Sequence, residues 1–446
     1  MHTIPRQQEQ DRLRICILSA GAGGMYCGSC LRDNALASAL LRGGHRVALV
    51  PLYSPVRTDS PGVAIDEVFL GGINAYLQYA SVIFRYTPRA VDWLFDRPWL
   101  LNLAGSYGAQ TSPAKLGPFI LSILEGEEGP QIKEIRRLAR FIADELKPEV
   151  ISLPNLMLIG LARLLRRETG APIVCELTGE DIFLEAMAEP YRSQAKEIIR
   201  QRTRDVDQLV ATSAYYAERM AEYLAVERSK ITVVYPGVSR EQIEAAPAVA
   251  GANRRPPTIG FLARICPEKG LHGLVEALGL LRQMPGLGQA RVRAAGYLGP
   301  AHRAWYESLR ERIGREGLAE VFTYAGEVDL AGKLAFFDSI DLLCVPTTFQ
   351  EPKGMYILEA FARGVPVVQP NHGAFPELIS LSEAGVLVPP GDAQALAIAL
   401  GELLNDPGRR AQLGARGRGA VAARFTDDHM AAEMLRVYEG VQAASA

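Results

Sequence analysis

The sequence predicts an α/β protein made of two doubly wound domains, each with a parallel sheet between layers of helices. Two observations carry this prediction. Short apolar runs of strand length alternate with amphipathic helical segments through both halves of the chain, which is the pattern of parallel sheets covered on both faces. The chain also has 446 residues, more than a single hydrophobic core normally organises.

The expected domain boundaries follow from breaks in this alternation. The polar stretch 244–257 is rich in Ala and Pro and has no hydrophobic period, so it is the expected linker. Each domain is expected to be Rossmann-like, with parallel strands joined through helices. We therefore divide the chain into a disordered start at 1–12, an amino-terminal domain at 13–243, the linker, a carboxy-terminal domain at 258–424 and a final amphipathic helix at 425–446.

The amino-terminal domain begins with a βαβ unit that contains a glycine-rich turn, 21–28. A dinucleotide-binding turn has the spacing Gly-x-Gly-x-x-Gly and an acidic residue at the end of the second strand. Here the glycine spacing differs, and the second strand ends at Val50 to Tyr53 without an acid. We therefore reject a nicotinamide cofactor. The glycines instead predict close approach of the backbone to another charged or hydroxylated ligand.

Polar residues follow this turn at the start of the first helix. Arg32, Asp33 and Asn34 are unusual at the beginning of a helix that should pack on a sheet, and with Tyr26 they are expected to contact an acceptor. A lone C-x-x-C at 27–30 overlaps the turn. Without a second pair or suitably spaced histidines, packing is favoured over zinc, and a redox role stays open.

Residues 53–145 break the alternation and are expected to form a helical insertion in the first domain. Aromatic side chains crowd 75–99, and the chain is then broken by Gly and Pro as far as 118. An acceptor site is one interpretation of these aromatics, and a satellite core under a long excursion is the other. The basic and aromatic segment 84–89 also leaves open a weak contact with a membrane surface.

The most informative stretch of the second domain is 347–377. An apolar run at 342–346 predicts a strand, and Gly354 and Met355 begin a short helix soon after it. Free backbone N–H groups and the helix dipole at such a start favour anions, phosphate above all. Glu359 is about five residues into this helix, hence roughly 7–8 Å further along its axis. A carboxylate so placed is expected to accept hydrogen bonds from ribose hydroxyls.

Two cations are predicted at the same edge of the second sheet. Arg264 and Lys269 lie in the loop after the strand run 258–263, at the carboxyl end of that strand. There they are placed to neutralise a diphosphate. Ordinary surface charges on a βα loop are the alternative. We favour the functional interpretation because these cations and the stretch 347–377 are predicted at one edge.

The segment E-P-x-G-x-x-x-L-E-A at 351–360, followed by G-V-P-V-V, resembles the retaining glycosyltransferases of family 4. The resemblance implies the GT-B fold, with two Rossmann-like domains facing a central cleft and a C-terminal helix that crosses back to the first domain. It implies a nucleotide-diphosphate-sugar donor, with UDP- and GDP-sugars preferred, and a sugar, polyol or lipid-linked acceptor. It further implies hexosyl transfer with retention of anomeric configuration, without a cofactor or metal.

The same resemblance assigns roles to single residues. Glu351, the first glutamate of the Glu-x7-Glu signature, is expected near the hydroxyls of the transferred sugar. Thr178 stands where the family has a sugar-contacting histidine, so Thr178, Glu180 or Asp181 is expected to hold these hydroxyls. The implied substrate-binding residues are Gly23, Gly24, Arg264, Lys269, Val328, Lys353, Gly354, Met355, Tyr356 and Glu359.

Composition and charge argue against several other classes. The net charge is −2 without a basic excess, so nucleic acid is not an expected partner. The start is polar and lacks a signal-peptide pattern, and no run reaches the roughly 20 apolar residues that span a bilayer. A cytoplasmic protein is therefore expected, with peripheral membrane contact left open. The six cysteines lie mostly in apolar runs, which predicts buried thiols rather than disulfides.

Other functions are compatible with the same predicted fold. A non-catalytic nucleotide-sugar-binding protein would bind the donor without turnover, and Thr178 in place of the family histidine keeps that alternative open. A GT-B epimerase would act without an acceptor domain of this kind. A phosphorylase needs a pyridoxal lysine and a much longer chain. Measuring turnover with and without an acceptor separates these alternatives.

Overall fold

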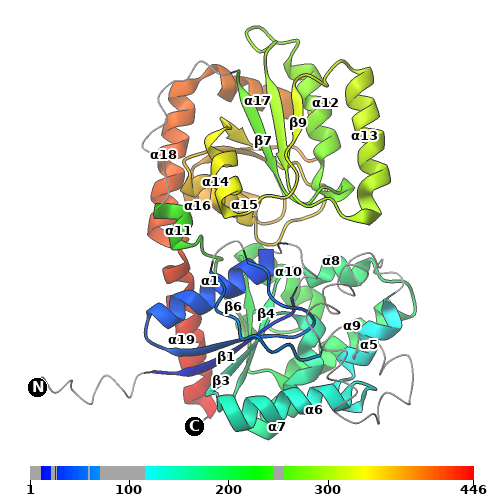
Figure 1. Cartoon of the computed structure of the whole chain (residues 1–446), viewed down its shortest axis with the longest axis vertical. Helices are drawn as coiled ribbons and strands as arrows, with labels where there is room; N and C mark the ends of the chain where they lie inside the picture. The colour runs from blue at the N-terminus through cyan, green and yellow to red at the C-terminus, as the bar shows by residue number, and fades with distance from the viewer. Residues whose placement is uncertain are drawn as a thin grey trace, which may run out of the picture. The chain divides into compact units, whose positions relative to one another are not determined.

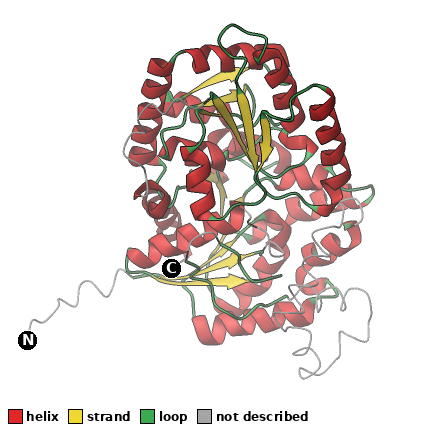
Figure 2. Ribbon diagram, turned by 45° about the horizontal axis from the view of Figure 1, so that its top comes forward, coloured by secondary structure: helices red, strands yellow, loops and turns green. Residues whose placement is uncertain are grey.

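The computed structural model describes residues 12–21, 26, 28–58, 61–70, 116–244 and 256–445, and the structural statements below concern these residues. The chain divides into two compact units (Figure 1). Unit 1 consists of Met1–Tyr235 and Asp428–Ala446, and unit 2 consists of Pro236–Asp427. Each unit has one parallel sheet with helices packed on it (Figure 2).

The sheet of unit 1 has six parallel strands in the order β2-β1-β3-β4-β5-β6. The strands are β1 (Arg14–Ser19), β2 (Arg46–Pro51), β3 (Val150–Leu153), β4 (Ile173–Leu177), β5 (Gln208–Ala211) and β6 (Ile231–Val233). The strand order reverses between β1 and β3. In an open α/β sheet, ligands bind outside the carboxyl ends of the strands at such a reversal.

Helices cover both faces of this sheet. They are α1 (Gly28–Arg42), α5 (Gly117–Leu124), α6 (Ile132–Phe141), α7 (Ala162–Thr169), α8 (Glu180–Glu185), α9 (Tyr191–Arg202), α10 (Ala214–Leu224) and α19 (Asp427–Ser445). Shorter helical turns are η4 (Gly126–Glu128), η5 (Ile142–Leu146), η6 (Leu156–Leu161), η7 (Thr203–Asp205) and η8 (Arg228–Lys230). The side chains of each strand alternate between the two faces, so each face has its own apolar core.

The C-terminal helix α19 packs on the first sheet, which confirms the expected return of the chain end to the first domain. Met434 and Tyr438 of α19 share an apolar cluster with Ile15 and Ile17 of β1 and with Leu36 of α1. These side chains are at most 2% exposed. The helices α1 and α19 therefore form one layer, and α5, α6, α7, α9 and α10 contribute to the core on the other face.

The turn after α5 packs directly on the backbone of η6. A Cβ atom on Gly126, whose φ is 62°, would lie 2.0 Å from the carbonyl oxygen of Gly160. A Cβ atom on Gly160 would lie 2.4 Å from the carbonyl oxygen of Ile123. A side chain at either position would push the two segments apart, so this approach of two backbones requires glycine.

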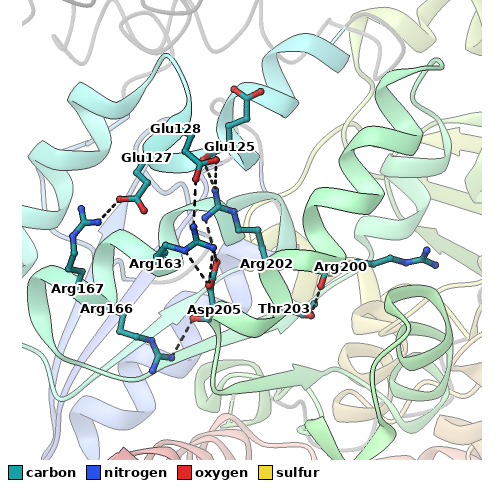
Figure 3. Close-up of polar contacts among 10 residues, drawn as sticks. All are labelled: Glu125, Glu127, Glu128, Arg163, Arg166, Arg167, Arg200, Arg202, Thr203 and Asp205. Atoms are coloured by element: carbon teal, nitrogen blue, oxygen red, sulfur yellow. Dashed lines mark hydrogen bonds and ion pairs between the residues drawn. The ribbon is translucent and has the colours of Figure 1, made fainter.

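Ion pairs surround this backbone contact (Figure 3). Arg163 lies 3.6 Å from a Glu128 oxygen and 3.2 Å from an Asp205 oxygen. Arg202 donates to the carbonyl oxygen of Glu125 at 2.7 Å and lies 3.5 Å from Asp205. The pair of Arg163 and Glu128 is exposed, and such pairs contribute only about 0.2–1 kcal/mol. Their main effect is to orient the η4 turn against α7 and α9.

A buried polar layer lies on the α1 side of the unit 1 sheet, at the carboxyl ends of the strands. Ser19, Ser152 and Glu176 belong to β1, β3 and β4, and each is at most 1% exposed. Arg32 of α1 forms an ion pair with Glu176, and Asp33 accepts a hydrogen bond from the Ser19 hydroxyl at 3.0 Å. Burial lowers the pKa of Arg32, although the charge of Asp33 opposes this effect. These contacts tie the start of α1 to β1 and β4.

The sheet of unit 2 also has six parallel strands, in the order β12-β11-β10-β7-β8-β9. The strands are β7 (Thr258–Leu262), β8 (Arg291–Ala295), β9 (Phe322–Tyr324), β10 (Leu342–Leu343), β11 (Val367–Pro370) and β12 (Gly385–Val388). The helices are α11 (Arg240–Glu244), α12 (Leu271–Leu281), α13 (Arg303–Arg315), α14 (Leu330–Asp338), α15 (Met355–Ala362), α16 (Phe375–Ser382), α17 (Ala393–Asn405) and α18 (Pro407–Arg424), with the turns η9 (Pro267–Lys269) and η10 (Pro300–His302). The order reverses between β10 and β7.

The two parallel sheets confirm the predicted fold class, and single elements differ from expectation. The helical turns α8 and α16 were not predicted. The described part of the insertion, 116–145, is helical, whereas 71–115 and the aromatic stretch within it lie outside the described residues. Most of the expected linker, 245–255, also lies outside them. The predicted domain boundaries therefore stay predictions. Among the described residues, no helix is both long and apolar enough to cross a membrane.

We predict that Arg32→Met destabilises unit 1 by about 3–5 kcal/mol, because Glu176 would stay buried without its counter-ion. The double variant Arg32→Met/Glu176→Gln should recover much of this loss, since a neutral amide needs no cation. Hydrogen exchange of the β1, β3 and β4 amides during a urea titration measures both effects. A single variant as stable as the wild type would show that unit 1 does not depend on this pair.

Candidate functional site

The candidate site of unit 2 is built around the start of α15. Gly354 precedes this helix with a φ of 60°, in the left-handed region that favours glycine. A Cβ atom there would also lie 2.9 Å from Cδ1 of Leu378. The backbone N–H of Gly354 donates a hydrogen bond to the Glu351 carboxylate. The predicted helix start at Gly354 and Met355 is therefore present.

Glu351 is paired with a buried lysine. Its Oε2 atom lies 2.5 Å from Nζ of Lys269, and both side chains are at most 10% exposed. The same ammonium lies 4.6 Å from the ring centroid of Phe349 and 5.4 Å from that of Tyr356. Burial by itself would raise the pKa of Glu351, but Lys269, Lys353 and the Gly354 amide outweigh it and hold the pKa below its usual range. The carboxylate is thus kept ionised.

Backbone contacts between two loops position Lys269. A Cβ atom on Gly270, whose φ is 78°, would lie 1.8 Å from the carbonyl oxygen of Pro346, just beyond β10. The Thr347 hydroxyl donates to the carbonyl oxygen of Glu268 at 2.8 Å. The η9 turn therefore rests directly on the chain that leaves β10. This packing brings Lys269 to Glu351 across 82 residues of sequence.

Arg264 occupies a different environment at the same edge of the sheet. It follows β7 and is exposed, whereas Lys269 is buried. Gly296, after β8, packs against the backbone beside it, because a Cβ atom there would lie 1.9 Å from the carbonyl oxygen of Ala263. The Ile265 amide donates to the carbonyl oxygen of Tyr297 at 2.9 Å. Arg264 thus presents a cation to solvent from a fixed backbone.

The segment that contains Val328, one of the expected substrate-binding residues, joins this edge through β9. The carbonyl oxygen of Gly326 accepts a hydrogen bond from the Gly296 amide at 2.8 Å. Val328 is half-buried and comes just before Asp329, which caps α14 by accepting from the Gly332 amide at 2.8 Å. The ends of β7, β8 and β9 and the start of α14 are therefore linked by their backbones.

Glu359, the second glutamate of the signature, is also paired with a buried lysine. Its Oε1 atom lies 2.7 Å from Nζ of Lys333 on α14, and both side chains are at most 10% exposed. Gln242 of α11 donates to the same Oε1 atom at 3.5 Å. Both glutamates of the predicted pair are thus held by lysines, Glu351 from η9 and Glu359 from α14.

The other predicted residues of this stretch lie close by. Lys353 is half-buried and contributes a favourable charge to Glu351. Met355 is half-buried, and Tyr356 is buried. The Tyr356 hydroxyl has no hydrogen-bond partner among the described residues. Burial, followed by the negative charge of Glu351, raises the pKa of Tyr356, so this hydroxyl stays protonated.

In unit 1, the loop after β4 is held by its own carboxylate. Glu180 accepts hydrogen bonds from the Thr178 amide at 2.9 Å, from the Thr178 hydroxyl at 2.9 Å and from the Gly179 amide at 3.1 Å. Burial raises the pKa of Glu180, and these hydrogen bonds only partly oppose it. Glu180 therefore shapes the turn before α8, and a contact of Thr178 or Glu180 with a sugar stays a prediction.

Asp181 is likewise occupied by side chains of α10. It accepts from the Tyr216 hydroxyl at 2.9 Å and from Nε of Arg219 at 3.0 Å. Tyr216 also lies 3.3 Å from an oxygen of Glu180. Burial, then the charges of the two carboxylates, raises the pKa of Tyr216 well above its usual value. This network ties the β4–α8 loop to α10, and the catalytic role of Asp181 stays a prediction.

The predicted acceptor residues are mostly engaged within unit 1. Arg32 and Asp33 lie in the buried polar layer described above. The Asn34 amide donates to the carbonyl oxygen of Pro61 at 3.1 Å, so it anchors a later loop. Tyr26 is half-exposed, with the Arg57 guanidinium 4.1 Å from its ring centroid. Acceptor contact stays a prediction for all four residues, and Gly23 and Gly24 lie outside the described residues.

A cavity of about 620 Å³ in unit 1 lies away from the carboxyl ends of the strands. It is lined by residues near the start of β5 and the ends of α9 and α10, including Arg200, Lys230 and Gln208. Arg200 donates to the Tyr223 carbonyl oxygen at 2.9 Å, and Lys230 donates to that of Thr203 at 2.6 Å. Both cations therefore already bind carbonyl oxygens of the protein's own backbone. Within the described ranges, no group of three or more His, Cys, Asp and Glu side chains could hold a metal ion.

Sequence reasoning missed several residues around the glutamate pair. Lys333 lies inside the helix α14, where a lysine by itself gives no signal of burial. Gln242 stands next to the expected linker and is far from Glu359 in sequence. Gly373 was also missed, although a Cβ atom there would lie 2.7 Å from the backbone of Glu351. Of these three residues, only Gln242 had a weak signal in the sequence, a helix pattern just before the Pro-rich stretch.

Comparison with known families agrees with this architecture. The family model described as "Glycosyl transferases group 1" matches residues 242–420, and the one described as "Glycosyltransferase Family 4" matches residues 115–242. A phosphatidyl-myo-inositol mannosyltransferase of Mycobacterium leprae is 36% identical over 210 residues, 46% of this chain and 52% of that protein. A D-inositol 3-phosphate glycosyltransferase of Stackebrandtia nassauensis is 27% identical over 91% of this chain and 94% of that protein.

Solved structures show the same fold. Sucrose-phosphate synthase from Thermosynechococcus elongatus aligns with a TM-score of 0.70 and 19% identity, over 97% of this chain and 100% of that one. Anabaena HepE in complex with UDP aligns with a TM-score of 0.64 and 16% identity, over 96% of this chain and 100% of that one. The fold is therefore GT-B, and the chain belongs to glycosyltransferase family 4. The matched region spans between half and two thirds of the length of the first curated relatives.

We predict that Glu351 makes unit 2 sensitive to acid. Because its pKa lies below the ordinary 4.5 in the folded protein, its stabilising contribution is complete above pH 4.5 and is lost as the pH falls through the lowered value. Glu351→Gln should remove this part of the pH dependence, while Glu402→Gln, at an exposed position, should keep it. Urea titrations at decreasing pH, followed by hydrogen exchange of unit 2, measure the effect. Identical pH profiles for wild type and Glu351→Gln would contradict this assignment.

Proposed function

We propose that the protein transfers a hexosyl group from a nucleotide-diphosphate sugar to an acceptor hydroxyl, with retention of anomeric configuration and without a metal ion or cofactor. One observation carries this proposal. Glu351 and Glu359 flank the start of α15 at the carboxyl edge of the unit 2 sheet, and each is paired with a buried lysine. A helix start between two carboxyl groups suits a diphosphate between two polyhydroxylated groups, ribose and sugar.

The donor would be held by unit 2. Arg264, Lys269 and the amides at the start of α15 would neutralise the diphosphate and the charge that develops on it as it leaves. Glu359 would accept hydrogen bonds from the ribose, and Glu351 from the transferred sugar. Lys269 is placed 2.5 Å from Glu351, so one cation would serve both the sugar-binding carboxylate and the phosphate. The base is proposed to be uridine or guanosine.

The chemical step would proceed on one face of the sugar. The bond between the anomeric carbon and the diphosphate oxygen breaks, and the acceptor oxygen forms a new bond on the same face. The departing phosphate oxygen takes the proton of the acceptor hydroxyl, so no side chain has to act as a base. The acceptor is proposed to be a sugar, a polyol or a lipid-linked molecule, because relatives are named phosphatidyl-myo-inositol mannosyltransferase and D-inositol 3-phosphate glycosyltransferase.

We predict that one nucleoside diphosphate among UDP, GDP and ADP, or one of its sugar conjugates, raises the melting temperature of the wild type. At 100 times its dissociation constant, such a ligand adds about 2.7 kcal/mol of stability. Glu359→Ala should abolish most of the shift, because the ribose would lose its acceptor. Glu402→Ala, the same substitution at an exposed position of unit 2, should leave the shift unchanged.

Turnover decides between transfer and simple binding. The stabilising sugar nucleotide is incubated with candidate acceptors, and release of the free nucleotide and formation of the glycoside are followed by chromatography. Release that depends on the acceptor supports a transferase. Stabilisation without any release would support a non-catalytic binder, and interconversion of the sugar without an acceptor would support an epimerase. The absence of stabilisation by every nucleotide would contradict the proposed donor site.

We also propose that the protein acts in the cytoplasm and makes peripheral contact with an anionic membrane through α6. Lys133, Arg136 and Arg140 recur at three- and four-residue intervals, so they line one side of the helix. Arg136 and Arg140 are exposed, while Ile135 and Leu138 are buried in the core. A basic stripe on a helix that is anchored by its apolar side favours anionic lipid headgroups.

We predict that Arg136→Glu/Arg140→Glu weakens sedimentation with vesicles that contain anionic lipid. Each basic residue near such a surface contributes about 1 kcal/mol, so loss of two should lower the partition coefficient roughly 30-fold or more. Neutral vesicles should bind neither protein. Arg310→Glu/Arg315→Glu, on α13 of unit 2, is the matched control. Equal sedimentation of the wild type and the α6 variant would rule out this surface.

A further inference from the structure

Lys333 is a buried cation to which no role has yet been given. It lies on α14, is 7% exposed as a residue, and places Nζ 2.7 Å from Oε1 of Glu359. The neighbouring helix α11 adds Gln242, whose Nε2 lies 3.5 Å from the same oxygen. Two donors from two helices therefore converge on one oxygen of one carboxylate.

The other oxygen of Glu359 is in a different situation. Among the described residues, no hydrogen bond or ion pair engages Oε2 of Glu359. A carboxylate oxygen has two lone pairs and accepts strongly when the group is ionised. With Oε1 occupied by Lys333 and Gln242, the side chain is left with a single acceptor atom for a ligand, and its rotation is fixed by the two donors.

Stability alone does not account for the Lys333–Glu359 pair. Removing two charges from water costs about as much as their attraction returns, so a buried ion pair is often no more stabilising than two apolar side chains of the same size. The same two helices already have a second buried cation, Arg363, which lies 2.6 Å from Asp338. The position of Lys333 is therefore better explained by what it does to Glu359.

We propose that Lys333 is a positioning residue that makes Glu359 selective for the hydroxyls of the donor ribose. It holds Oε1 so that Oε2 is presented in one orientation to the sugar of the nucleotide. The selectivity between ribose and deoxyribose thus depends on a residue that does not itself touch the ligand. This inference rests on the proposed function, in which Glu359 binds the ribose of a nucleotide-sugar donor.

The test compares, in two proteins, how strongly nucleotide binding depends on the ribose hydroxyls, which we call the hydroxyl dependence. Calorimetry gives the dissociation constants of the stabilising nucleoside diphosphate and of its 2′-deoxy and 3′-deoxy forms, for the wild type and for Lys333→Met. In the wild type, loss of the contacted hydroxyl should weaken binding roughly 10- to 100-fold, as for a hydrogen bond to a charged group. In Lys333→Met, the ratio of the dissociation constant of the deoxy form to that of the complete nucleotide should fall to a few-fold. The affinity for the deoxy form should stay near that of the wild type.

Arg363→Met is the matched control, because it removes the other buried cation between α14 and α15 and leaves Glu359 paired. It should retain the hydroxyl dependence of the wild type. If Lys333→Met does not fold, Lys333→Arg and Lys333→Gln replace it, and the arginine should preserve the dependence better than the glutamine. An equal ratio of dissociation constants in wild type and in Lys333→Gln or Lys333→Met would overturn the inference.

The outcomes also separate this inference from the proposed function. If the wild type binds no nucleoside diphosphate, the proposed donor site fails, and the role of Lys333 fails with it. If the wild type binds the diphosphate with the same affinity with and without the ribose hydroxyls, the donor site stands and the role of Lys333 fails. If Lys333→Met and Arg363→Met weaken all ligands equally, Lys333 only supports the packing of the helices, and the inference is again overturned.

Discussion

The need to pair charges that are removed from water shapes both units at the carboxyl edges of their sheets. In unit 1, Arg32 and Glu176 are almost fully buried, and each would be costly without the other. In unit 2, Lys269 holds Glu351 and Lys333 holds Glu359. Each pair joins segments that are distant in sequence, so the charges fix how loops and helices meet where parallel-sheet proteins place their ligands.

Close backbone approaches make these pairings geometrically available. A Cβ atom on Gly270 would collide with the carbonyl oxygen of Pro346, and one on Gly296 would collide with that of Ala263. Without side chains at these positions, the loops after β7, β8 and β10 lie directly on one another. Lys269 then reaches Glu351 from a buried position, while Arg264 stays exposed. The same edge therefore has one cation engaged by the protein and one that faces solvent.

The two loops predicted to perform chemistry are organised differently in the two units. In unit 2 the carboxylates accept from lysines, and the start of α15 lies between them. In unit 1 the carboxylates of Glu180 and Asp181 accept from their own loop and from α10. The unit 2 site thus has two carboxyl acceptors, each paired with a lysine, beside a helix start that suits a phosphorylated ligand. The unit 1 loop is a turn whose carboxylates are engaged by hydrogen bonds within unit 1.

Hydrophobic periodicity was enough to predict the fold class, and the motif at 351–360 was enough to suggest the family, because both patterns act over short stretches. The sequence also predicted Glu351, Gly354, Glu359 and Lys269 at one edge of the second sheet, and their functional roles stay predictions. The strand expected at 258–263 is present as β7, Thr258–Leu262, whereas the short helices α8 and α16 were not predicted. Which lysine pairs with which glutamate depends on how segments that are distant in sequence pack together. Lys333 and Gln242 are 26 and 117 residues away from Glu359 in the sequence. No local pattern distinguishes a solvent-exposed lysine on a helix from a lysine that is buried against another helix. Burial and pairing are properties of packed elements, and they appear only when the chain is folded.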